Sequence, residues 1–209
     1  MSSATTTIAE LMGGIVRFFP NSILLSLIVI GFSTSNVSWL LVSVGGIVTM
    51  ILTILLQHVL SQFFSYGKMP GVFVVEACSS YPGGTEQFTN FPSLWITLST
   101  FFATYIFTNA FQIYSEAPAP GVSLNKISVQ QRKSMGLISM VAVSILFIFL
   151  LMARYNTSCE SIGGLLISLL FGMGCGYAWW RILCACPGSS NYADIHGVTI
   201  GLRPGVQFQ

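Results

Sequence analysis

The sequence predicts an all-α protein, a polytopic transmembrane helical bundle of about five spans. Three observations predict this fold class. Hydrophobic residues make up 53% of the 209 residues and charged residues only 7%, against about a quarter charged in an ordinary soluble domain. The mean hydropathy is +0.77. The apolar residues also gather in long uncharged runs, and a helix needs about 20 such residues to cross a bilayer.

The same composition limits the classes of protein and of binding partner that fit the chain. It excludes a soluble enzyme, a disordered chain and a disulfide-rich secreted module. The net charge of +2 is too small and too scattered to favour nucleic acid. The expected partners are therefore the lipid bilayer and other protein subunits.

Five stretches of the chain qualify as spans. They divide it into an N-terminal segment at 1–14, a bundle at 15–183 and a C-terminal tail at 184–209. The predicted spans lie near residues 15–32, 37–60, 94–114, 136–152 and 162–180.

The first two spans differ in quality. The first is the weakest, because Arg17 and Pro20 lie within its first turns. The sequence leaves open whether it begins as an interfacial helix and enters the membrane only after Pro20. The second span carries no charge along its whole length, which is typical of a membrane-crossing helix.

The later spans have boundary signals of their own. Pro92 precedes the third, where proline is tolerated at a helix start. The fourth is short but dense in Ile, Leu, Val and Phe. The fifth closes with Trp179, Trp180 and Arg181, as an interfacial aromatic belt and a snorkelling cation would.

Two packing signals stand out among these spans. Gly172-x-x-x-Gly176 indicates close helix–helix contact, either within the chain or between chains. The third span is aromatic nearly all round, which fits lipid contact and core packing or a surface that docks on a partner. Its aromatic residues are Phe101, Phe102, Tyr105, Phe107, Phe111 and Tyr114.

Basic residues predict the orientation of this multi-pass integral membrane protein. Five of them fall on the C-terminal side of a five-span topology and three on the other, so the positive-inside rule places the C-terminus in the cytoplasm. The five are Lys126, Arg132, Lys133, Arg181 and Arg203. The polar Ser115–Lys133 segment, with two prolines, is expected to form an exposed loop.

Four cysteines are candidates for a disulfide or for palmitoylation. Cys78 and Cys159 share the non-cytoplasmic side, where they form a disulfide or remain two free thiols. Cys184 and Cys186 follow the last span and are candidate palmitoylation sites or inert juxtamembrane thiols. No cysteine or histidine spacing resembles a zinc site, and neither a metal nor a cofactor is expected.

Polar groups converge on the non-cytoplasmic face. Lys68 follows the second span, Ser93 opens the third, Arg154 ends the fourth and Glu160 precedes the fifth. Cations beside a helix N-terminus form an anion site, with phosphate as its natural occupant. The alternative is that Lys68 and Arg154 are interfacial anchors and that Ser93 only caps its helix.

The order and spacing of these groups resemble the type 2 phosphatidic acid phosphatase superfamily of membrane lipid phosphatases. The resemblance runs from about Val37 to Trp180. The third motif of the family is closest, with Ala153-Arg154-Tyr155 leading to Glu160 and a glycine-rich final span. Phe91-Pro92-Ser93 matches next best, and Lys68 is all that remains of the first motif.

The departures from the family fall on its catalytic groups. The resemblance assigns Glu160 to the position of the nucleophilic histidine, Gly164 to its aspartate partner and Trp95 to the general acid. Nucleophile, orienting carboxylate and acid are thus replaced together, which implies the fold without its chemistry.

The sequence therefore predicts a non-catalytic structural or scaffolding component of a membrane-bound assembly, such as a virion membrane or an organellar complex. Two alternatives use Glu160, Arg154, Ser93 and Lys68. One is a lipid phosphate or isoprenyl pyrophosphate phosphatase, and the other is a protein that binds a phosphorylated lipid.

Overall fold

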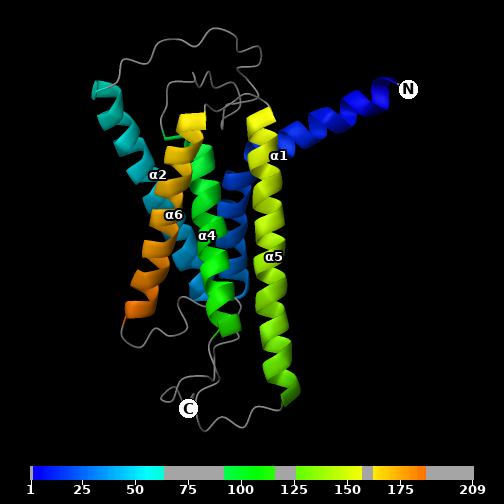
Figure 1. Ribbon diagram of the computed structural model, residues 1–209, viewed down its shortest axis with the longest axis vertical. Coiled ribbons are helices and arrows are strands. Elements are labelled where there is room, and N and C mark those ends of the chain that lie inside the picture. The colour runs from blue at the N-terminus through cyan, green and yellow to red at the C-terminus, as the bar shows by residue number, and fades with distance from the viewer. Residues whose placement is uncertain (1, 64–91, 116–125, 157–161, 187–209) are drawn as a thin grey trace.

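The chain folds into helices alone over the residues that the structure describes. The structure is a computed structural model, and it describes residues 2–63, 92–115, 126–156 and 162–186. The all-α prediction is confirmed within these residues (Figure 1). The helices are α1 (Ser2–Ser33), α2 (Val37–Phe63), α4 (Leu94–Ser115), α5 (Lys126–Asn156) and α6 (Ile162–Ala185).

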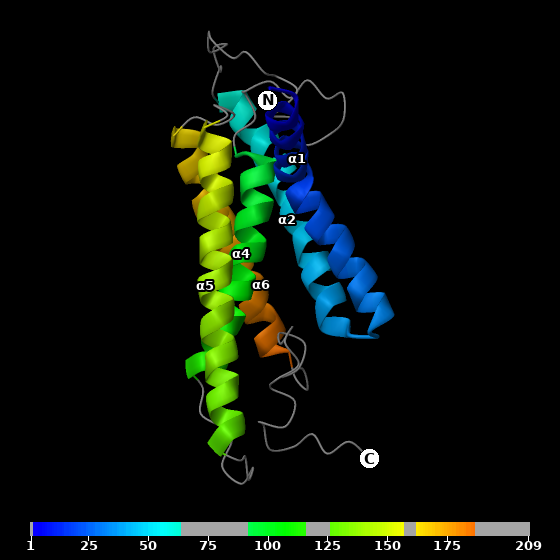
Figure 2. The same ribbon diagram turned by 90° about the vertical axis from the view of Figure 1, so that its right-hand side faces the viewer.

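Four of these helices are long and apolar enough to cross a membrane. The qualifying stretches are Val37–Leu60, Leu94–Ser115, Gln130–Tyr155 and Gly163–Ala185. Phe18–Ser33 of α1 is a shorter apolar stretch. Successive helices run in opposite directions along the bundle (Figures 1 and 2). The protein is thus a multi-pass helical bundle of membrane-spanning composition.

The fourth helix is longer than the predicted span. The sequence was expected to form a loop through Lys133, but α5 begins at Lys126, so the loop prediction is wrong for 126–133. Lys, Gln and Arg are good helix formers. The polar residues that start α5 therefore extend the helix before the predicted apolar span at 136–152. The fifth predicted span likewise continues as α6 to Ala185, past the predicted end at 180.

A tight turn joins α1 to α2. The amide of Asn36 donates to the carbonyl of Gly31 at 3.0 Å, and the amide of Ser35 to that of Phe32 at 3.3 Å. This pair of bonds is a Schellman cap, and Ser35 takes the left-handed conformation that the cap requires, with φ 52°. The side chain of Asn36 then accepts the amide of Ser38 at 3.0 Å and starts α2.

Helix α4 lies at the centre and packs against the other four helices. The apolar stretch of α4 is 61% buried, while that of α5 is only 17% buried, although the stretch in α5 is the more apolar of the two. The buried residues of α4 include Thr97, Ser99, Thr100 and Asn109. Because lipid is as apolar as any core, helices in membranes associate through small and polar residues rather than through excess hydrophobicity. The polarity of α4 therefore marks its central place.

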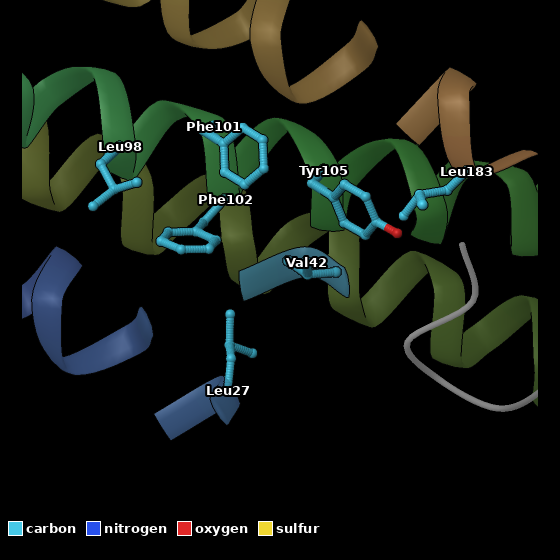
Figure 3. Close-up of a cluster of buried hydrophobic side chains, with 7 residues drawn as sticks. All are labelled: Leu27, Val42, Leu98, Phe101, Phe102, Tyr105 and Leu183. Carbon is cyan, nitrogen blue, oxygen red and sulfur yellow. The ribbon is translucent and has the colours of Figure 1, made fainter. Parts of the chain in front are cut away.

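One core cluster joins four helices (Figure 3). In it the rings of Phe101 and Phe102 meet edge to face, with centroids 5.3 Å apart. Its fully buried members are Leu27, Val42, Leu98, Phe101, Phe102, Tyr105 and Leu183. The aromatic perimeter predicted for the third span is thus divided. Its first half is core, while Phe107, Phe111 and Tyr114 are exposed.

The Gly172-x-x-x-Gly176 pattern works within the chain. A methyl group added at Gly172 would lie 2.6 Å from the carbonyl oxygen of Thr97, and one at Gly176 would lie 2.7 Å from that of Phe101. Both carbonyls belong to α4. The glycines therefore allow the backbones of α6 and α4 to approach closely.

Helix α5 contacts the bundle through one face. That face begins with Arg132 and ends with Arg154, both buried, with the buried Gly136, Met140 and Leu150 between them. The two arginines are 22 residues apart, which places them within about 40° of each other around a helix. The other faces of α5 expose large apolar side chains, as lipid contact requires.

Candidate functional site

The candidate site lies at the end of the bundle where α2 and α5 finish and α4 and α6 begin (Figure 1). Ser93 stands directly before α4 as its N-cap. Its hydroxyl accepts the amide of Ile96 at 3.4 Å, and its carbonyl accepts the amide of Thr97 at 2.9 Å. Ser93 is 8% exposed, so the predicted capping role is what the geometry supports.

A buried hydrogen-bond relay ties this cap to α6. The backbone amide of Ser93 donates to Oγ of Ser168 at 2.7 Å. The Ser168 hydroxyl in turn donates to the carbonyl oxygen of Gly164 at 2.7 Å. Ser168 is fully buried, so its hydroxyl satisfies an amide that would otherwise cost free energy in an apolar interior.

A second polar contact reaches the same place from α2. Nε2 of Gln57 donates to the carbonyl oxygen of Pro92 at 2.6 Å. The neighbouring His58, the histidine that sequence reasoning would consider first here, is exposed. Sequence reasoning missed Gln57 and Ser168. The only signal for either was a polar side chain within an apolar run.

Arg154 stacks on Trp95. Its guanidinium carbon lies 4.8 Å from the centroid of the Trp95 ring, and the two residues are 3% and 2% exposed. Around them, Ile96 and Leu150 form a second apolar cluster with Phe19, Leu151, Leu165 and Leu169 at its edge. A desolvated arginine over an indole face gains a cation–π attraction that is stronger than the same contact in water.

Only half of the predicted anion site lies in the described residues. Ser93 and Arg154 are brought to the same end of the bundle, whereas Lys68 and Glu160 lie outside the described residues. Of the positions that the family resemblance would make catalytic, Trp95 is packed under Arg154 and Gly164 is buried. Arg154 contacts Trp95 and so joins α5 to α4, and the Ser168 hydroxyl joins Gly164 of α6 to Ser93 before α4. Within the described ranges, no three His, Cys, Asp or Glu residues gather as metal ligands would.

The cysteine hypotheses divide in the same way. Cys78 and Cys159 lie outside the described residues. Cys184 falls inside α6 and packs at the edge of the core, half-buried, while Cys186 is exposed just after the helix. Neither forms a disulfide within the described residues, and Sγ of Cys186 donates to the carbonyl oxygen of Ile182 at 3.3 Å.

Trp179 packs against the core. Its Nε1 donates to the carbonyl oxygen of Leu41 in α2 at 3.0 Å. A methyl group at Gly45 would overlap that same nitrogen. Gly45 thus makes room for the indole ring. The place of Trp179 in an interfacial belt stays a prediction.

Comparison with known proteins adds no relative. No protein-family model, no curated protein and no solved structure matches the chain.

Proposed function

We propose that this protein is a non-catalytic structural component of a membrane-bound assembly. The observation that supports this most directly is the burial of Arg154 against Trp95. A phosphatase or a phospholipid-binding site needs its cation to reach a phosphate group. Arg154 is 3% exposed and lies over an indole face, where it links α5 to α4.

The other polar groups at this end have comparable roles. Ser168 accepts the amide of Ser93, and Gln57 donates to the carbonyl of Pro92. Each contact joins two helices. A rigid bundle held by such contacts suits a scaffold, whereas a phosphatase needs an open site with an acid and a nucleophile.

The exposed aromatic residues of α4 support a subunit role. Phe107, Phe111 and Tyr114 are 42%, 53% and 42% exposed, and their spacing of four and three residues places them on one face of the helix. Aromatic residues are enriched in the buried centres of protein–protein interfaces. We assign this face to contact with another protein subunit.

The test begins with the full chain in a mild detergent or in excised native bilayer discs. We expect it to run on native gels as a stoichiometric assembly well above its own 22.7 kDa. Replacing Phe107 and Phe111 with alanine should release it from that assembly. The matched control replaces Ile145 and Ile148, which are exposed on α5, and should leave the assembly intact.

An activity measurement separates the proposal from the phosphatase alternative. Purified protein is incubated with phosphatidic acid and with isoprenyl pyrophosphates, and phosphate release is measured. We expect none. Release that disappears in Glu160→Gln would overturn the structural role, and copurified phospholipid that is lost in Arg154→Ala would favour the lipid-binding alternative.

A further inference from the structure

We propose that residues 2–17, the N-terminal half of α1, form an amphipathic helix that lies on the membrane surface with its apolar face in the lipid. This inference does not depend on the proposed function. It concerns an interaction surface whose partner is the interfacial layer of the bilayer in which the bundle sits.

The first observation is the course of α1. It is one helix from Ser2 to Ser33, with Pro20 inside it. The N-terminal half of α1, in dark blue, leaves the bundle sideways and runs across the long axis of the other helices (Figures 1 and 2). Proline in a helix removes a hydrogen bond and bends the axis. The N-terminal half of α1 therefore runs at an angle to the bundle, whereas its apolar Phe18–Ser33 part runs along it.

The second observation is where the bend occurs. It lies at the end of the bundle where α2 and α5 finish and α4 and α6 begin (Figure 1). Those helices have the length and composition to span the bilayer, so their ends mark its boundary. A helix that leaves sideways at this level runs through the layer of lipid headgroups.

The third observation is the residue pattern of this half-helix. Ile8, Leu11, Met12, Ile15 and Val16 recur at the spacing of a single helix face and occupy an arc of about 140° at 100° per residue, which also contains Ala4 and Thr5. The residues on the opposite side are polar or lack a side chain: Ser3, Thr6, Thr7, Glu10, Gly13, Gly14 and Arg17. Such a two-sided helix is typical of segments that lie in the membrane interface.

The composition also favours lipid over water as the surroundings of this helix. Gly13 and Gly14 weaken any helix that contains them, and isolated helices of this length are marginal in water. An apolar surface against one face would stabilise the helix. Glu10 and Arg17 are its two charged residues and cancel each other, so attraction to anionic lipid is not required.

The test uses the full chain in phosphatidylcholine vesicles. A small environment-sensitive fluorescent amino acid replaces Ile8 or Ile15 on the apolar face, or Thr6 or Glu10 on the polar face. Quenchers are phosphatidylcholines that carry a spin label either near the top of the acyl chain or near its end. We expect a fluorophore at Ile8 or Ile15 to show blue-shifted emission and strong quenching by the spin label near the top of the acyl chain. A fluorophore at Thr6 or Glu10 should show water-like emission. Adding phosphatidylserine should change neither.

Three results would overturn the proposal. Water-like emission at all four positions would mean that the helix projects into solvent. Stronger quenching by the deep label would mean that it crosses the membrane. Labels at Ile8 and Ile15 could also show blue-shifted emission that no lipid spin label quenches. If that blue shift is lost when the protein is diluted into excess vesicles, a second copy of the chain covers the apolar face. Thermal unfolding of each labelled protein checks that the bundle remains folded.

Discussion

The indole nitrogen of Trp179 in α6 donates to the carbonyl oxygen of Leu41 in α2 across 3.0 Å. This bond joins residues 138 positions apart and lies beside Gly45, whose missing side chain admits the ring. At the other end of α2, Gln57 makes the corresponding contact to Pro92. Helix α2 is thus fixed to the rest of the bundle at two levels by side chains that reach backbone carbonyls.

Replacing Trp179 with phenylalanine removes the hydrogen bond but keeps an aromatic ring. We expect the free energy of unfolding in detergent to fall by about 0.5–1.5 kcal/mol, the usual net value of one intramolecular hydrogen bond. Trp180→Phe is the matched control, because Nε1 of Trp180 is buried and has no hydrogen-bond partner in the described part of the chain. Equal losses in the two variants would show that the bond to Leu41 contributes nothing.

Replacing glycine with alanine should change the stability of the bundle differently at Gly172, which faces α4, and at Gly174, which faces open space. Gly172→Ala places a methyl group 2.6 Å from a backbone oxygen of α4, whereas Gly174→Ala meets nothing within 4 Å. We expect the first to destabilise the bundle by about 1–3 kcal/mol, the common cost of overpacking. The second should be neutral or stabilising by up to about 1 kcal/mol, because alanine is the better helix former. Thermal unfolding of both variants measures the difference.

The stack of Arg154 on Trp95 can be measured by a double-mutant cycle. Arg154→Met, Trp95→Leu and the double variant should give a coupling free energy of about 1–2 kcal/mol, as expected for a desolvated cation–π pair. Arg181→Met, at an exposed site of α6, should change stability by less than about 0.5 kcal/mol. A coupling near zero would mean that the two side chains are neighbours without mutual attraction.

Ser168→Ala should loosen the start of α4. It leaves the buried amide of Ser93 without its acceptor, a loss of about 1–3 kcal/mol. Hydrogen exchange should accelerate at the Ser93 amide. Ser134→Ala removes an exposed hydroxyl that donates to the carbonyl of Gln131 at 2.8 Å and should leave both readouts unchanged. Unaltered exchange at Ser93 in the Ser168 variant would contradict the relay.

The sequence predicted the helices well, because long uncharged runs have few other solutions. Which helix is central was not predicted. In a soluble protein the most apolar stretch is usually the most buried, but the stretch in α5 is the most apolar of the four that could span a membrane and the least buried, as lipid contact allows. The better signals were the small and polar residues, namely Gly172 and Gly176 in α6 and the threonines of α4.

Only two of the four candidate site residues can be compared with their predicted positions. Ser93 and Arg154 lie at the same end of the bundle, as the alternation of the spans requires, whereas Lys68 and Glu160 lie outside the described residues. Ser93 bonds to Ser168, and Arg154 stacks on Trp95. Both contacts depend on how each helix is rotated about its axis and shifted along it. Neither is encoded in the order of the residues along one helix. Gln57 escaped notice for the same reason.

The two buried arginines of α5 have a consequence for the bilayer thickness that suits the protein. Arg132 and Arg154 are separated by about 33 Å along the helix, at 1.5 Å per residue, and apart from Lys133 every residue between them is uncharged. That length is close to the hydrocarbon thickness of an average bilayer, about 30 Å. In a membrane several ångströms thinner the helix must tilt or the lipid must stretch, at a fraction of a kcal/mol per ångström. The length of α5 between its two arginines is therefore matched to a bilayer of about average thickness.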